Sequence, residues 1–526
     1  MSKSLSLAKS SARGGFNVFW GLIISSIISA VGIIVIADLL TGEEFGVVTI
    51  VFMGPNLIAT IRDLGIDQAT IKYATQYRID RDTENLKSIV VTGTLFEIIL
   101  GVLFTVFSIV LSGFMADILG RPTIVDLIKI ASFTILAGAL LKIAQSSFIG
   151  YEKMKIYSLT LVLQSLFKTV LMILLIHLQF GVYGAVVGNA VSFVGVGIVS
   201  IAVLYIVVIQ KLERQKETSF QLISTLKRML KFGFPLSIST TLFGILSNFY
   251  SFFVAIYTTD LIFGNYQVAI NFGILISIFA SPIATMMFPT FSKVKGNEDQ
   301  KTLSSVFQYS VKYTSLLIVP VTLAVITLSQ PIVETIFQNK YVYAPFFLSF
   351  YAITYLYSAI GNLSADALIS SQGKTQFNLK IAIITFIVGI IFSILLIPVF
   401  GVLGLLVVHN IVSLPGILIS LWWINKHYGA TIDWKSTIKI LAASAFSGVL
   451  TYIIGYQLKF AGLITLFVSA AIFLFSYIIS APLIGAINYN DTQNLKEMVK
   501  GLGPLTPVIN LLIYPLEKIT RYKQSK

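Results

Sequence analysis

The residues best able to do chemistry in this sequence are charged side chains that interrupt long apolar runs. In the first half of the chain they are Arg62, Asp63, Glu97, Lys142 and Lys168. A charge inside a membrane costs on the order of 3 kcal/mol on insertion scales, so such residues are usually paired or functional. The cations predict binding of an anionic group such as a phosphate or pyrophosphate. The carboxylates predict a site for a coupling H+ or Na+.

The charges around Arg62 also have a structural interpretation. Arg62 and Asp63 point about 100° apart on a helix, so Arg62 needs a partner on another helix or in a ligand. Otherwise it extends to the membrane surface and pairs with an acid there. Asp63 and Asp67 are four residues apart and are expected on one helix face. Arg62 is expected near mid-depth in the membrane, unless Gly65 ends the helix earlier. Asp67 is expected to be solvated or interfacial.

The remaining charged residues leave alternatives open. Lys168 is expected near mid-membrane, and Glu97 is its natural counter-ion. A Lys168–Glu97 pair that fixes helix packing is therefore the alternative to a role in a cavity. Lys142 is expected nearer the cytoplasmic end of its span, where it suits an anchor. In the second half of the chain Asp366 is a candidate for ion coupling, whereas His409 suits packing.

The composition indicates a polytopic membrane protein. The 526 residues are 56% hydrophobic and only 11% charged, whereas a soluble domain carries about 25% charged residues. The absence of cysteine excludes disulfides, thiolate metal sites and Cys nucleophiles. The three histidines are far apart in sequence, and no cofactor is predicted. The net charge of +14 is spread over many short loops, which indicates cytoplasmic loops rather than nucleic-acid binding.

Apolar stretches of about 20 residues predict about fourteen transmembrane helices. They are expected at 16–40, 46–71, 88–113, 123–150, 156–178, 181–209, 232–258, 264–291, 303–329, 343–371, 376–398, 402–425, 437–457 and 460–482. Lys and Arg concentrate in alternate loops, which places both termini in the cytoplasm and requires an even number of spans. The predicted fold is an all-α polytopic protein of the cell membrane.

An internal repeat organises these spans. Residues 176–191 (IHLQFGVYGAVVGNAV) align without gaps on residues 396–411 (LIPVFGVLGLLVVHNI), and the same offset carries spans 1–6 onto spans 7–12. Because six spans is an even number, the two copies are parallel, as in alternating-access carriers. The alternative is an old duplication in a static protein. The predicted domains are an N-terminal six-helix lobe (1–209), an amphipathic cytoplasmic linker (210–231), a C-terminal six-helix lobe (232–425), two further helices (426–482) and a cytoplasmic interfacial tail (483–526).

Short motifs add a family resemblance. The turn ADLLTGEEFG (37–46), the segment DLGI (63–66) and the turn GYEK (150–153) resemble those of Wzx-type polysaccharide-biosynthesis flippases, in the multidrug/oligosaccharidyl-lipid/polysaccharide exporter superfamily. The resemblance implies a fourteen-span, two-lobe exporter that moves lipid-linked oligosaccharide from the cytoplasmic to the outer leaflet. Relatives use cationic residues in a central cavity, and Arg62 and Lys168 match these by chemistry, not by motif. Unlike lipid-precursor flippases with an Arg in span 8, this chain has none there.

The predicted function is flipping of a polyprenyl-pyrophosphate-linked oligosaccharide for polysaccharide or glycan assembly, with H+ or Na+ as the coupling ion and membrane lipids as the surroundings. One alternative is a cation-coupled multidrug antiporter, which usually needs twelve spans. The other is a membrane glycosyltransferase or ligase, which would need a large catalytic loop; no enzyme motif occurs, so the protein is not expected to be an enzyme. The predicted substrate-binding residues are Arg62, Lys142 and Lys168, and the predicted ion-coupling residues are Asp63, Glu97 and Asp366.

Overall fold

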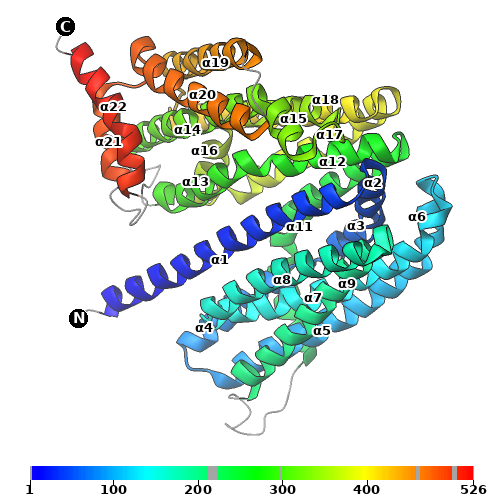
Figure 1. Cartoon of the computed structure of the whole chain (residues 1–526). Helices are drawn as coiled ribbons and strands as arrows, with labels where there is room; N and C mark the ends of the chain where they lie inside the picture. Colours follow the sequence, from blue (N-terminus) through cyan, green and yellow to red (C-terminus); the bar gives the residue numbers. More distant parts are fainter. Residues whose placement is uncertain are drawn as a thin grey trace. The chain divides into compact units, whose positions relative to one another are not determined.

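The computed structural model describes residues 3–210, 222–292, 294, 299–457, 462–499 and 506–524. Over these ranges the chain forms helices joined by short turns, without a strand (Figure 1). Residues 211–221 of the predicted linker lie outside the described residues, and the helix that follows begins at Leu222.

The number of long apolar helices agrees with a polytopic membrane protein. In the described ranges eleven segments are long and apolar enough to cross a membrane, or up to twelve if the bent pair Ala344–Ile360 and Asn362–Ser371 is one span. The segment Met154–Ile209 contains two helices, α8 (Met154–Leu175) and α9 (Gly181–Leu204). The 35-residue α11 (Leu222–Ile256) has an apolar portion from Thr241. Counting the bent pair as one span, separating α8 from α9 and including α11 gives fourteen spans in the described ranges, and the all-α fold class is confirmed.

The chain divides into two compact units, which are described separately. Unit 1 comprises Met1–Gln267 and Phe386–Leu405, and unit 2 comprises Val268–Thr385 and Leu406–Lys526. These units are defined by packing, so the lobes expected from the repeat stay a prediction. One reason that α11 belongs to unit 1 is Arg121, whose guanidinium donates to Asp260 Oδ1 at 2.5 Å and to the carbonyl oxygens of Ala255 and Thr258 at 2.8 and 2.9 Å.

Unit 1 is built around α7 (Val125–Gly150), which packs against α5 (Thr83–Val110) and α9. Small buried residues such as Ala131, Ala139 and Ala144 let neighbouring helices approach α7 closely. The long α1 (Lys3–Leu39) packs along α8, and both run side by side in Figure 1. α6 (Ser112–Ile118) precedes α7, and α11 lies against α5 and the helices of the second span.

The second span is three helices rather than the single run expected at 46–71. They are α2 (Gly42–Val51), α3 (Met53–Arg62) and α4 (Ile66–Ile79). The turn before α2 is a capping box, because Thr41 Oγ1 accepts from Glu44 N at 3.1 Å and Glu44 Oε2 accepts from Thr41 N at 2.8 Å. Gly65 separates α3 from α4 at φ +77°, a left-handed conformation that favours glycine.

The repeat motif has the same local structure in both copies. Gly181 and Gly401 take positive φ angles of +50° and +56°. Gly181 is the first residue of α9, and Gly401 directly precedes α18 (Val402–Tyr428). In both copies a Cβ added to the next motif glycine, Gly184 or Gly404, would contact the end of the preceding helix. The recurring FGVxG sequence therefore encodes a tight turn between two antiparallel helices.

Unit 2 is built around α14 (Gln300–Phe337), which packs against α15 (Ala344–Ala352), α19 (Trp434–Gln457) and α20 (Gly462–Ile484). α13 (Ile274–Ser292) packs against α16 (Asn362–Ser371). Three of the described helices contain residues of both units, namely α12 (Asp260–Phe272), α17 (Thr375–Phe400) and α18.

The predicted tail forms a pair of helices in unit 2, and an ion pair connects it to α14. α21 (Tyr489–Val499) packs against α22 (Thr506–Gln524), and Lys496 forms an ion pair with Glu517 between them. Asp491 Oδ2 accepts a hydrogen bond from Lys312 Nζ of α14 at 2.7 Å. The side chain of Asp491 is 3% exposed and that of Lys312 is 12% exposed. The pair fixes the start of α21 against a membrane-spanning helix.

Replacing Gly65 with Ala is expected to lower stability by at least about 1 kcal/mol, because a non-glycine residue is strained at this φ. A Cβ there would also lie 2.2 Å from the carbonyl oxygen of Gly233. Thermal unfolding of the detergent-solubilised protein measures the effect. Gly195→Ala on α9 is the matched control, since a Cβ at Gly195 meets nothing within 4 Å. Equal melting temperatures for Gly65→Ala and Gly195→Ala would contradict this explanation of the helix break.

Candidate functional site

A buried ion pair joins the second span to the third. Arg62, the last residue of α3, donates from Nη1 to Glu97 Oε2 on α5 at 2.6 Å, and the two side chains are only 5% and 7% exposed. Arg62 Nε is also buried and has no hydrogen-bond partner. Arg62 therefore points to another helix, as expected, and keeps one donor for a further acceptor.

A second ion pair lies beside the first. Lys142 of α7 pairs with Asp63, and its Nζ lies 3.5 Å from Asp67 Oδ2. The prediction that both carboxylates share one helix face is wrong, because α3 ends at Arg62 and Asp67 belongs to the first turn of α4. The helix break nevertheless brings Asp63 and Asp67 to the same lysine. Lys142 is thus held by two acids, and its side chain remains 46% exposed.

The charges of this cluster do not balance. Two cations, Arg62 and Lys142, face three carboxylates, Asp63, Asp67 and Glu97. With every group ionised the cluster carries one more negative than positive charge. An unbalanced negative charge in apolar surroundings is unfavourable, so the ionised cluster favours binding of a cation.

The cluster opens into a pocket of about 400 Å³ between α3, α7 and α11. This size lies within the range of about 300–1,000 Å³ that is usual for small-molecule sites. Asn248 Nδ2 donates to Thr60 Oγ1 at 3.1 Å across the pocket wall. Three charged residues of the cluster, Arg62, Asp63 and Lys142, line the pocket. The neutral hydrogen-bonding side chains in the lining are those of Asn56, Thr60, Thr134, Thr241 and Asn248.

The sequence reasoning missed the neutral polar residues of the pocket. Asn56 and Thr60 are four residues apart on α3, and Thr241 and Asn248 are seven apart on α11. Both spacings place the paired side chains on one helix face. Polar residues at helical spacing in an apolar run were therefore the signal that could have identified them.

Lys168 does not join the cluster. The expected counter-ion Glu97 is bonded to Arg62 instead, so the predicted Lys168–Glu97 pair is wrong. Lys168 lies on α8, partly buried, and no hydrogen bond or ion pair is formed by its amine within the described ranges. One helical turn earlier, both amide atoms of Gln164 are buried without a hydrogen-bond partner.

Asp366 and His409 belong to unit 2, whereas the charged cluster around Arg62 belongs to unit 1. Asp366 is exposed on α16 and accepts from Asn378 Nδ2 at 3.0 Å. The ring of His409 packs edge-on against Tyr351, with 5.9 Å between the ring centroids. Of the predicted site residues, the structure therefore brings together Arg62, Asp63, Glu97 and Lys142.

Comparison with known proteins connects this fold to membrane transporters. The structure of the lipid II flippase MurJ in an inward closed conformation superposes with a TM-score of 0.71 and 16% identity, over 89% of this chain and 98% of MurJ. An inward-facing multidrug resistance MATE transporter of the MOP superfamily superposes with a TM-score of 0.61 and 18% identity, over 78% of this chain and 98% of that one. These likenesses establish the fold.

Sequence comparison supplies the family. An uncharacterized membrane protein of Methanocaldococcus jannaschii is 22% identical over 408 residues, which cover 74% of this chain and 79% of that protein. Residues 35–345 match the family described as Polysaccharide biosynthesis protein, and this match spans more than half of the 526 residues. The chain is thus a membrane protein that belongs to the polysaccharide biosynthesis protein family.

Proposed function

We propose that this protein flips a polyprenyl-pyrophosphate-linked oligosaccharide from the cytoplasmic to the outer leaflet for polysaccharide or glycan assembly. The observation that carries the proposal is the polar pocket of unit 1, which presents Arg62 and Lys142 between apolar helices. A pyrophosphate needs charge-assisted donors to leave water, and a guanidinium with a lysine supplies them. The polysaccharide biosynthesis family agrees with a glycan-bearing substrate.

The ion pairs suggest how the headgroup would be bound. In the structure Glu97 pairs with Arg62, and Asp63 and Asp67 both pair with Lys142. An anionic headgroup would compete with these carboxylates for the two cations. H+ or Na+ binding to the released carboxylates would offset their charge, and this exchange would couple substrate binding to a change of access.

The remaining parts of the proposal concern the setting. The concentration of Lys and Arg in alternate loops supports cytoplasmic termini, and the cell membrane is the proposed location. Alternating access of the two predicted lobes would carry the headgroup across while the polyprenyl chain stays in lipid. The transporter fold agrees with a non-enzymatic role.

One observation favours a second candidate, a cation-coupled multidrug antiporter. The cluster holds three carboxylates against two cations, so its excess charge is negative and suits a cationic substrate. The structural likeness to a MATE transporter agrees with this candidate. The two functions differ in the charge of the substrate, which a transport assay distinguishes.

Arg62→Ala and Lys142→Ala are each expected to reduce flipping at least about tenfold, since a hydrogen bond to a charged group contributes about 1.5–3 kcal/mol. The measurement uses the purified protein in vesicles that contain a fluorescent pyrophosphoryl-polyprenol sugar, with a membrane-impermeant quencher outside. Lys129→Ala is the matched control, because Lys129 lies on the same helix and pairs with Asp126 at the surface. Full activity in both variants, or efflux of cationic drugs without lipid movement, would refute the flippase proposal.

A pair of variants separates a functional role of Arg62 from a purely structural one. Arg62→Leu alone is expected to lower stability by about 3–5 kcal/mol, because Glu97 is left as an unpaired buried charge. Arg62→Leu combined with Glu97→Leu is expected to restore stability, since a buried ion pair can be replaced by apolar residues of similar size. Thermal unfolding and the flipping assay are run on both variants. Recovery of flipping together with stability would show that Arg62 serves packing only.

Lys168→Met is expected to leave the melting temperature unchanged or raised, because no ion pair is lost and a buried amine is removed. If Lys168 binds the substrate, as the sequence predicts, the same variant loses flipping. Lys168→Arg, which retains the charge, serves as the conservative control. Unchanged flipping in Lys168→Met would remove this residue from the substrate site.

A further inference from the structure

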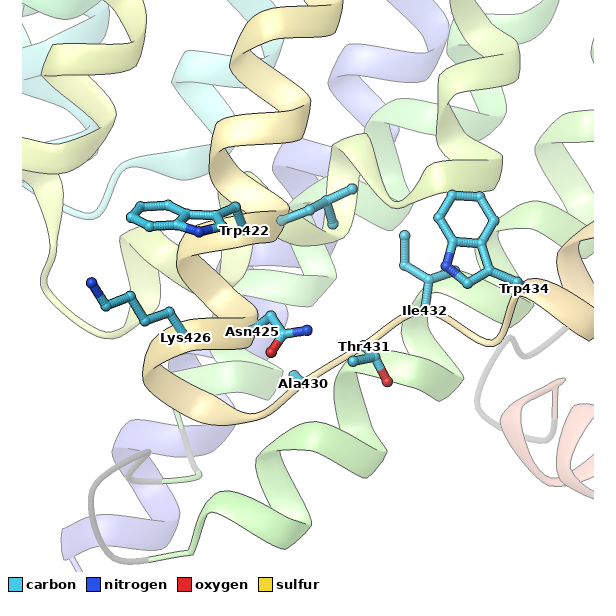
Figure 2. Close-up of a pocket in the computed structure, with 8 residues that line it drawn as sticks. Trp422, Asn425, Lys426, Ala430, Thr431, Ile432 and Trp434 are labelled. Carbon is cyan, nitrogen blue, oxygen red and sulfur yellow. The ribbon is translucent and has the colours of Figure 1, made fainter.

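A second pocket, of about 390 Å³, lies where α18 ends and α19 begins in unit 2. Figure 2 shows Trp422 and Lys426 projecting from one side of α18, with Trp434 across the pocket at the start of α19. The segment between them carries Ala430, Thr431 and Ile432. This pocket shares no residue with the charged site of unit 1.

The pocket has an apolar floor and an exposed aromatic rim. Ala430 and Ile432 are 2% and 8% exposed, whereas Trp422 and Trp434 are 59% and 55% exposed. Trp423, the next residue on α18, faces the other way and stacks between Phe377 and His427. Large exposed indoles at the end of a membrane-spanning helix are typical of the membrane–water boundary, where one part of the ring contacts lipid tails and the N–H contacts headgroups.

The pocket also presents a positive charge that the protein leaves available. Lys426 Nζ lies 5.0 Å from the Trp422 ring centroid, and no carboxylate within the described ranges pairs with it. The nearby acid Asp433 is engaged elsewhere, because it caps α19 by accepting from Ser436 N at 3.1 Å and from the Ser436 hydroxyl at 2.5 Å. Asn425 and Thr431 add an amide and a hydroxyl to the lining of the same pocket.

We propose that this pocket binds the headgroup of an anionic membrane phospholipid. Its phosphate would be held by Lys426, Asn425 and Thr431, and its acyl chains would follow the outer faces of Trp422 and Trp434. The last turn of α18 carries Lys426 and His427, and Lys435 and Lys439 follow in α19, so this end of the unit is basic. Each such lysine is worth about 1 kcal/mol of attraction to an anionic surface. The site is independent of the proposed transport function.

Tryptophan fluorescence can test the site directly, because the chain has only four tryptophans. The full-length protein with Trp20→Phe is reconstituted in vesicles that contain brominated phosphatidylglycerol or, at the same mole fraction, brominated phosphatidylcholine. Bromine quenches indoles in contact with it. The brominated anionic lipid is expected to reach half-maximal quenching at about a fivefold lower mole fraction, which corresponds to one lysine–phosphate interaction.

Two further variants decide the outcome. Lys426→Gln is expected to abolish the preference for the anionic lipid, whereas Lys435→Gln, an exposed neighbour that does not line the pocket, is expected to keep it. Equal quenching by both lipids, or equal loss in both variants, would show ordinary boundary lipid and overturn the proposal. Relief of quenching by unlabelled pyrophosphoryl-polyprenol sugar but not by unlabelled phosphatidylglycerol would assign the pocket to a transported lipid, and would also overturn it.

Discussion

The buried ion pair between Arg62 and Glu97 is the constraint on which unit 1 depends. Neither charge is stable alone in apolar surroundings, and their mutual attraction offsets desolvation only if the geometry is well kept. The two residues are 35 positions apart, so α3 and α5 must be held in register. The helix break at Gly65 has a related consequence, because it turns Asp63 and Asp67 toward Lys142 on a third helix.

Under the proposed function, this arrangement would make the pocket selective through competition. Both cations are already paired, so a weakly charged molecule would gain little by entering. A strongly anionic headgroup would replace the carboxylates, and a cation would neutralise the acids that are released. The unpaired donor of Arg62 and the neutral amides and hydroxyls of α3 and α11 provide hydrogen bonds without further charge. The same cluster therefore supports both candidate functions: its two cations suit the anionic substrate of a flippase, and its three carboxylates suit the cationic substrate of an antiporter.

Unit 2 shows a different use of polar residues. Its buried pair, Lys312 with Asp491, connects α14 to the tail helices and lines neither of the two pockets described above. Its exposed tryptophans and Lys426 lie at a helix end and not inside a span. In unit 2 these charges lie at a helix end and at the attachment of the tail, whereas unit 1 concentrates charge where α3, α4, α5 and α7 meet.

The sequence by itself determined the all-α polytopic fold class, the recurring FGVxG motif and the residues Arg62, Asp63, Glu97 and Lys142 as charges within apolar runs. These follow from length, hydropathy and the cost of a charge in an apolar run, which are all local properties. Only the tertiary structure decided the partners: Glu97 pairs with Arg62 and not with Lys168, and Lys142 reaches both aspartates. Which side chains meet depends on helix breaks and on the rotation of each helix about its axis, and periodicity in one helix carries no information about its neighbours.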